Sequence, residues 1–285
     1  MKAQFDHSLI SSFYLWFERE LLSDKIAAYT TGLDNVFQYH PEANLPDGFI
    51  SYQGSYRQLV ADQDVSVPNS GIFVNSSFVT GAASGLYLDY NDGRVIMPAA
   101  SGTTLNITAN STVKEVNTYM TNDDVEKILM EYDFIVDGQS QPDSASRDSD
   151  KDEKSYFLPA CFVIPSQSNN KVFAFGGEED TRTSITVMVL TDNNFVMDGV
   201  LNHFRDRSRT CVPIIDFNDF PYGDSFTVKS FPYEYNALAS TASSDSMIET
   251  VNASRVTEKL NNKLNKGFQI GFLNFELSTY RFPRL

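Results

Sequence analysis

The chain has 285 residues, of which 41% are hydrophobic and 13% aromatic, so it can bury a substantial core as one large domain or two smaller ones. This composition excludes a chain that is disordered throughout. Its 22 basic residues against 37 acidic ones give a formal net charge of −15, which removes the attractive field expected of a sequence-reading DNA-binding protein. An acidic surface fits ordinary solubility; the functional alternative is a channel wall past which DNA slides without sticking.

An amphipathic helix is predicted between Asp6 and Thr30, because apolar residues recur there at helical spacing. This apolar stripe consists of Ile10, Phe13, Tyr14, Phe17 and Leu21. Asp6 is placed to act as the N-cap, and Gly32 can close the far end. Trp16 lies beside the stripe and widens it. The helix therefore either caps the domain's own sheet or also packs on a neighbouring subunit, with Phe13 and Trp16 as interface candidates.

The segment from Gly32 to Gly71 is rich in Gly, Pro, Asn and Tyr and has little periodicity, which predicts a long, partly extended loop. Ile72 to Val79 is then β-prone and interrupted by Asn75-Ser76-Ser77, which predicts a hairpin. A second hairpin is predicted around Tyr90 to Gly93, because apolar and polar residues alternate on both sides and Asn-Asp-Gly suits a tight turn.

Two further alternating runs follow, at Thr103 to Thr108 and at Val113 to Met120. A short helix is predicted to begin near Asn122, with Thr121 and Asp124 at the spacing of a capping box. Together with the two hairpins, these elements predict a small antiparallel β-sheet or sandwich over about residues 49–136.

The segment Asp137 to Lys154 has no large apolar residue and consists mainly of Ser, Asp, Lys and Gln, which predicts an acidic exposed loop or linker. It divides the chain into residues 1–136, an N-terminal helix plus β-rich domain, and residues 155–285, an α+β portion that can belong to the same compact unit. Its Asp148 to Asp152 run is not a calcium loop, since Glu153 and Pro159 replace the Gly and Glu that such a loop requires.

Strands alternate with two helices after residue 155. The strands are predicted at Tyr156 to Ile164, Val172 to Phe175, Ser184 to Leu190 and Val212 to Phe217. One or two closing strands are predicted at Phe268 to Phe275 and Thr279 to Phe282. One helix can be capped by Asp192 or Asn193. Its inward side chains are expected to be Phe195, Val196, Val200 and Phe204. A longer helix is predicted between Ser244 and Lys266. The fold class is therefore α+β, mainly β, with an N-terminal amphipathic helix and two or three further helices.

Arg205, Arg207 and Arg209 end the first of these helices. Positive charge there favours the negative end of the helix dipole, so helix capping explains the cluster. The functional alternative is an inter-subunit or phosphate contact, and we expect the arginines to pair with carboxylates of the same or the next subunit.

No catalytic, cofactor-binding or metal-ligating residue is predicted, and no cofactor. The three histidines, His7, His40 and His203, are scattered and form no zinc or triad pattern. Cys161 and Cys211 are too few for a disulfide framework, which favours buried free thiols. The cluster Asp216, Asp219 and Asp224 lies among aromatic residues, as in a glycosidase or sugar site, but its spacing is not diagnostic. Those aromatics are Phe217, Phe220, Tyr222 and Phe226.

No run approaches 18 apolar residues, and the first seven residues lack the apolar core of a signal peptide. We therefore expect a protein that is made and assembled in a cytoplasm, with no membrane partner.

Four motifs occur in a characteristic order: SYRQLVADQD, GIFVNSSFV, SGLYLDYNDGRVIM and STVKEVNTYMTNDDVEKIL. In this order, over roughly Phe49 to Asp133, the chain resembles a family of structural proteins of tailed-bacteriophage virions. The resemblance implies a non-enzymatic protein of the virion neck, assembled in the host cytoplasm. Tyr56 and Arg57, in the first motif, are further interface candidates.

The resemblance also implies a homo-oligomeric ring that joins the portal side of the head to the tail, next to portal, adaptor or tail proteins. Genomic DNA would pass through this ring without sequence-specific binding. The alternative is a glycan-binding or adhesion β-module of a phage tail or baseplate.

Overall fold

The computed structural model describes residues 5–41, 45, 47–65, 72–79, 85–99, 102–135, 155–173, 177–222, 232–256 and 268–282. Within these residues the chain forms four helices and fifteen strands, and the strands form three sheets. The predicted class, α+β and mainly β with an N-terminal helix, is confirmed. The predicted acidic loop, Asp137 to Lys154, lies outside the described residues.

One sheet has seven antiparallel strands in the order β4-β3-β7-β1-β2-β6-β5. Its strands are β1 (Tyr29–His40), β2 (Phe49–Gly54), β3 (Ile72–Val74), β4 (Ser77–Val79), β5 (Tyr87–Asp89), β6 (Arg94–Pro98) and β7 (Ile107–Lys114). Both predicted hairpins are confirmed, since β3 pairs with β4 and β5 pairs with β6.

The loop predicted from Gly32 to Gly71 is wrong, because β1 and β2 occupy much of it. Of the residues in β1 only Asn35 and Phe37 are fully buried. The amide oxygen of Asn35 accepts a hydrogen bond from the backbone N–H of Tyr56 at 3.2 Å. Because the polar residue Asn35 occupies an inward position, β1 lacks the alternation of apolar and polar residues by which a strand is predicted. Gly32, which does not end the first helix, lies at an irregularity in β1 with a φ of 74°.

The second sheet has six strands in the order β13-β14-β15-β12-β11-β8. They are β8 (Asn117–Met120), β11 (Ala160–Val172), β12 (Glu179–Thr191), β13 (Cys211–Ile214), β14 (Ser244–Arg255) and β15 (Gln269–Arg281). Only β8 and β11 pair in parallel within it. Because β8 belongs to this sheet, the sheets do not divide at residue 136. β9 (Asp133–Ile135) and β10 (Ser155–Phe157) form the separate two-stranded sheet.

The helix predicted between Ser244 and Lys266 is wrong over its described part, where β14 is found. A β-bulge between Ile248 and Thr250 adds one residue to the strand. Ile248 and Val251 therefore both face the core although they are three residues apart, which imitates helical spacing. The rest of the predicted helix lies outside the described residues. Of the one or two strands predicted at the end of the chain, the structure has one, β15.

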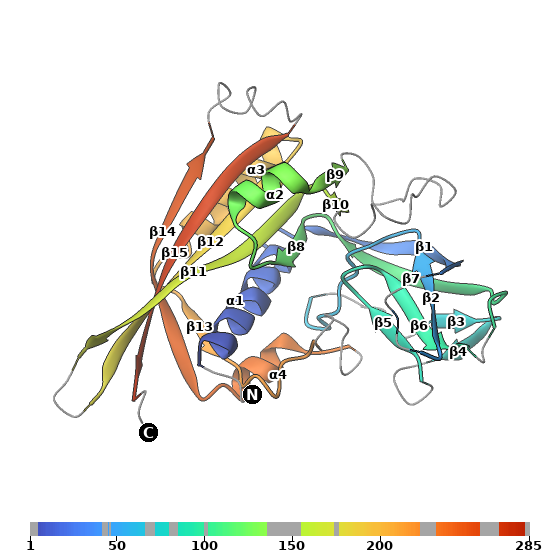
Figure 1. Cartoon of the computed structure of the whole chain (residues 1–285), viewed down its shortest axis with the longest axis horizontal. Coiled ribbons are helices and arrows are strands. Elements are labelled where there is room, and N and C mark those ends of the chain that lie inside the picture. The colour runs from blue at the N-terminus through green and yellow to red at the C-terminus, as the bar shows by residue number, and fades with distance from the viewer. Residues whose placement is uncertain are drawn as a thin grey trace.

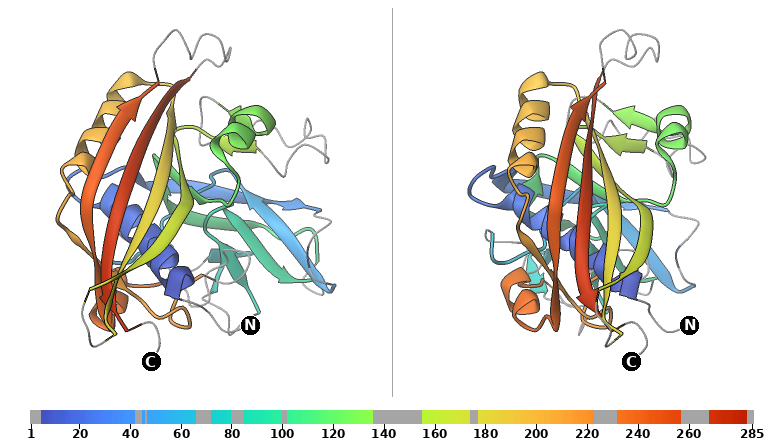
Figure 2. Two further views of the ribbon diagram at one scale, coloured as in Figure 1. Left: turned by 60° about the vertical axis from the view of Figure 1, so that its left-hand side comes forward. Right: turned by 90° about the vertical axis from the view of Figure 1, so that its left-hand side faces the viewer.

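The helices cover both faces of the six-stranded sheet. α1 (Phe5–Leu22) lies between the two large sheets (Figure 1). α3 (Asn194–Arg205) lies on one face of the six-stranded sheet, and α2 (Val125–Glu131) lies on the opposite face with β9 and β10 (Figure 2). α4 (Tyr235–Ser240) is a short helix whose first backbone N–H donates to Asp62, the partner of Arg19 near the end of α1. None of the described helices has the length and apolar character needed to span a bilayer.

An aromatic cluster joins α1, α3 and the six-stranded sheet. The rings of Phe17 and Phe204 are stacked with centroids 4.1 Å apart, and the ring of Phe13 meets that of Phe275 edge-on at 4.9 Å. Asn193 caps α3 as predicted, accepting the N–H of Phe195 at 2.7 Å. The inward residues of α3 are Met197, Val200, Leu201 and Phe204. Phe195 was wrongly expected among them and is 83% exposed.

Two phenylalanines of α3 provide a matched test of this packing. Phe204→Ala removes a fully buried ring, so we expect it to lower the free energy of unfolding by about 3–5 kcal/mol. Phe195→Ala should change it by less than about 0.5 kcal/mol. Urea denaturation followed by circular dichroism measures both, and equal losses from the two substitutions would contradict the assigned face of α3.

Candidate functional site

Two of the predicted interface residues lie inside the protein. Phe13 is fully buried and Trp16 is 5% exposed, so the expectation that they offer a surface to a neighbour is wrong. Eleven of the 18 residues of α1 are buried, because the helix is covered by both large sheets and by α3. A helix enclosed in this way has no free apolar face, and Trp16 instead packs edge-on against Phe204 at 5.9 Å.

The arginine cluster separates into one structural and two exposed residues. The Arg207 guanidinium lies 2.5 Å from Glu20 of α1, which also contacts His203 at 3.1 Å. Burial alone would raise the pKa of Glu20, but the bond with His203 and the charge of Arg207 hold that pKa below its ordinary value. The predicted pairing with a carboxylate is therefore confirmed for Arg207. Among the described residues Arg205 pairs with its exposed neighbour Asp206, and Arg209 is exposed.

Tyr56 and Arg57 are half-buried where the first motif crosses the β5–β6 turn. A Cβ on Gly93 would lie 2.1 Å from the carbonyl oxygen of Tyr56, and Gly93 has a φ of 59°, so only glycine fits there. The Arg57 guanidinium lies 5.0 Å above the ring of Phe157. The backbone N–H of Leu59 donates to the carbonyl of Tyr90 at 2.6 Å. These contacts hold the motif SYRQLVADQD against the motif SGLYLDYNDGRVIM.

The turn itself is held by a buried carboxylate. Asp89 accepts the backbone N–H groups of Asn91 and Asp92 and pairs with Arg94 at 2.8 Å. Burial, and then the charge of Asp92, raises the pKa of Asp89 to about 7. Each of these partners belongs to the hairpin, so this carboxylate has a structural role.

The end of the first motif supports a separate part of the surface. Asp62 accepts the backbone N–H of Tyr235 at 3.1 Å, and Asp64 accepts that of Asn236 at 2.6 Å. Both bonds hold the start of α4. The backbone N–H of Gln63 also donates to the carbonyl of Tyr233 at 2.8 Å. A tract near residue 60 thus fixes a segment some 170 positions later.

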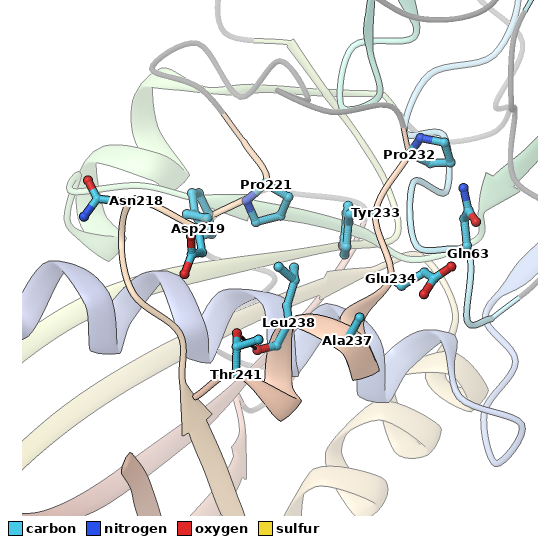
Figure 3. Close-up of a pocket in the computed structure, with 11 residues that line it drawn as sticks. Gln63, Asn218, Asp219, Pro221, Pro232, Tyr233, Glu234, Ala237, Leu238 and Thr241 are labelled. Carbon is cyan, nitrogen blue, oxygen red and sulfur yellow. Dashed lines mark hydrogen bonds between the residues drawn. The ribbon is translucent and has the colours of Figure 1, made fainter. Parts of the chain in front are cut away.

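A cavity of about 650 Å³ opens beside this junction, between residues 218–221 and α4, and its volume is typical of small-ligand sites. Asn218 and Asp219 lie at one end, and Gln63 and Glu234 lie at the other (Figure 3). Between them lie the apolar side chains of Pro221, Tyr233 and Leu238. We take this cavity as the candidate functional site.

The cavity unites residues that sequence reasoning had only partly singled out. Asp219 and Phe220 belonged to the suspected acidic and aromatic cluster, and both line it. Asp216 is not one of the lining residues. Its carboxylate accepts the backbone and side-chain N–H groups of Asn218. Asp224 and Phe226 lie outside the described residues. Glu234 was missed, and its only sequence signal would have been the pairing of its segment with the motif that contains Gln63.

The charge of the cavity limits its ligands. Asp219 and Glu234 are exposed, and the described residues that line the cavity include no Lys, Arg or His, so these residues disfavour anionic ligands. Among the described residues, no three His, Cys, Asp or Glu side chains are grouped to hold a metal ion. Cys161 is buried as predicted, but Cys211 is exposed.

Comparison with known proteins adds no family: no family model matches the chain, and no curated protein is significantly similar to it.

Asp62, which precedes the lining residue Gln63 and holds the start of α4, provides a pH test of how the cavity wall is anchored. Burial raises its pKa to about 6, although backbone hydrogen bonds and Arg19 oppose the shift. An unfolded Asp ionises near pH ~3.9, so between about pH 4 and 6 the folded state binds more protons, and Asp62 makes the wild type less stable as pH rises. Asp62→Asn keeps an acceptor for the backbone N–H groups of Tyr235 and Asp64, which both bond to the Asp62 carboxylate, and it does not ionise.

The variant should therefore gain stability relative to the wild type as the pH rises from 4 to 7. Urea denaturation at both pH values measures this difference. A difference that stays constant, or that shrinks with rising pH, would contradict a raised pKa at Asp62.

Proposed function

We propose that the protein is a non-enzymatic structural component of a tailed-phage particle, forming a ring at the neck that joins the portal side of the head to the tail around the DNA channel. The order of the four motifs supports the phage assignment. The observation that best supports self-assembly is a pair of dissimilar exposed apolar surfaces at opposite ends of the molecule's long axis (Figure 1).

The first surface, the sheet row, consists of Val36, Phe73 and Phe78, which are 45%, 43% and 53% exposed. In the strand register, Phe73 is opposite Phe78, and both Phe73 and Val36 are opposite Thr108. Directly paired residues project to the same face of a sheet, so the three side chains form one row across β4, β3, β7 and β1. The rings of Phe73 and Phe78 lie 5.2 Å apart.

The second surface, the arm tip, lies at the end of the long strands β11, β12 and β15, at the lower left of Figure 1. It consists of Phe173, Tyr280 and Phe282 and, on the opposite face of the same strands, Val172, all exposed. The rings of Phe173 and Tyr280 lie 4.6 Å apart. Val172, at 84% exposure, has almost no cover within the described residues.

Two different surfaces on one chain favour a head-to-tail contact. If the sheet row of one subunit covers the arm tip of the next, an open chain of subunits keeps one free surface of each kind, at its two ends, until the ring closes. Exposed apolar clusters commonly mark protein interfaces. The net charge of −15 suits a lumen that does not retain DNA.

Complementary variants test the head-to-tail contact. Phe73→Ser/Phe78→Ser and Val172→Ser/Phe173→Ser should each remain folded but monomeric, because each loses one of the two surfaces. An equimolar mixture should form a dimer and stop there, since each variant retains the surface that the other lacks. Mass photometry measures these states, and negative-stain microscopy shows whether the wild type forms rings.

Met130→Ser/Phe195→Ser is the matched control, because it removes two side chains that are 78% and 83% exposed on other elements. This control should assemble like the wild type. A wild type that is monomeric at every concentration, or a mixture that stays monomeric, would contradict the proposal.

The alternative, a glycan-binding or adhesion module of a tail or baseplate, is favoured by one observation. The candidate cavity places the carboxylates of Asp219 and Glu234 beside aromatic residues, which are groups that sugar sites use.

A further inference from the structure

We propose that the candidate cavity binds an extended segment of a partner protein in which two basic side chains flank an apolar one. This goes beyond assembly of the chain with itself, and it does not depend on it. The cavity is formed by the first motif, residues 218–221 and α4. None of these segments contributes to the sheet row or to the arm tip.

The ends of the cavity favour two positive charges. One end carries Asp219 and the other carries Glu234 (Figure 3). Both carboxylates are exposed, and neither has an ion-pair partner among the described residues. Since the described lining residues include no basic side chain, a Lys or Arg side chain at each end would meet a carboxylate that no described residue pairs with.

The amides and the apolar middle favour a peptide. Each end carries a carboxamide, Gln63 at one and Asn218 at the other. The carboxamide of Gln63 can both donate to and accept from a bound backbone. That of Asn218 already donates one N–H to Asp216 and keeps its oxygen and its other N–H for a ligand. The apolar residues between the ends, among them Leu238, provide a surface for an apolar side chain.

A sugar ligand fits these residues less well. Sugar sites commonly present an open aromatic face for the ring to stack on, but Phe220 and Tyr233 are each only 6% exposed. Their rings pack in the core instead, because the ring of Tyr222 lies between them, with its centroid 5.7 Å from that of Phe220 and 5.8 Å from that of Tyr233. The carboxylates are thus available to a ligand, whereas the aromatic faces are not.

The cavity wall is fixed before any ligand arrives. The hydrogen bonds from Tyr235 to Asp62 and from Asn236 to Asp64 anchor the start of α4. Gln63 lies between these two aspartates and is held by its own backbone bond to Tyr233. A wall that is already ordered reduces the entropy lost on binding.

Fluorescence anisotropy with three labelled peptides and the full chain tests the proposal. The probe is Gly-Arg-Leu-Arg-Gly, with Gly-Gln-Leu-Gln-Gly and Gly-Arg-Gly-Arg-Gly as controls for charge and for the apolar residue. The first should bind the wild type most tightly, and its affinity should fall as salt is added. Maltose is added as a competitor to test for a sugar site.

Variants locate the binding. Asp219→Asn/Glu234→Gln should weaken binding roughly fivefold or more, the effect of losing two exposed charge pairs. Ala237→Trp fills the cavity without changing charge and should also weaken it. Glu126→Gln/Asp192→Asn removes two exposed charges elsewhere and should bind like the wild type.

Equal weakening by the two charge-removing double variants would show attraction to the acidic surface in general and would overturn the proposal. Failure of the Arg-Leu-Arg peptide to bind, or its displacement by maltose, would overturn it as well. Ring assembly, measured by mass photometry, should be unchanged in Asp219→Asn/Glu234→Gln, so this proposal and the proposed neck role can fail separately.

Discussion

A buried ion pair between α1 and β7 sets the relation of the two large sheets. The ammonium group of Lys114 lies 2.6 Å from the carboxylate of Glu18, and the two side chains are 1% and 2% exposed. Removing one partner of such a pair leaves a buried charge, at a cost of about 3–5 kcal/mol. Because α1 also packs on the six-stranded sheet through Phe13 and Phe17, shifting the helix in either direction would break the pair or the aromatic stack.

The next residue of α1 extends this constraint to the candidate site. Arg19 lies 3.7 Å from Asp62, and Asp62 in turn holds the start of α4. Burial, and then the charge of Glu18, raises the pKa of Tyr222 and of Tyr233 well above the ordinary value. These phenols therefore stay neutral beside the buried pair. The cavity wall is positioned by the core and not by the surface loops alone.

How much of the structure the sequence predicts depends on how far apart along the chain the contacting residues lie. The two hairpins and the start of α3 were predicted correctly, because a turn or a cap involves residues a few positions apart. The strand β14 was predicted as a helix, because the one extra residue of its bulge shifts the inward positions after Ile248. Trp16 remained an interface candidate because a sequence does not show that a helix is covered on several sides. Only the fold joins Gln63 to Glu234 in one cavity.

The two proposals place opposite demands on the same acidic surface. Subunits that each carry a net charge of −15 repel one another, so contact between the sheet row and the arm tip depends on apolar burial and should strengthen when salt screens the repulsion. Binding of a basic segment at Asp219 and Glu234 relies on that same negative charge and weakens as salt is added. Assembly and partner binding should therefore respond to ionic strength with opposite signs, because one buries apolar side chains against a like-charged copy and the other pairs exposed carboxylates with cations.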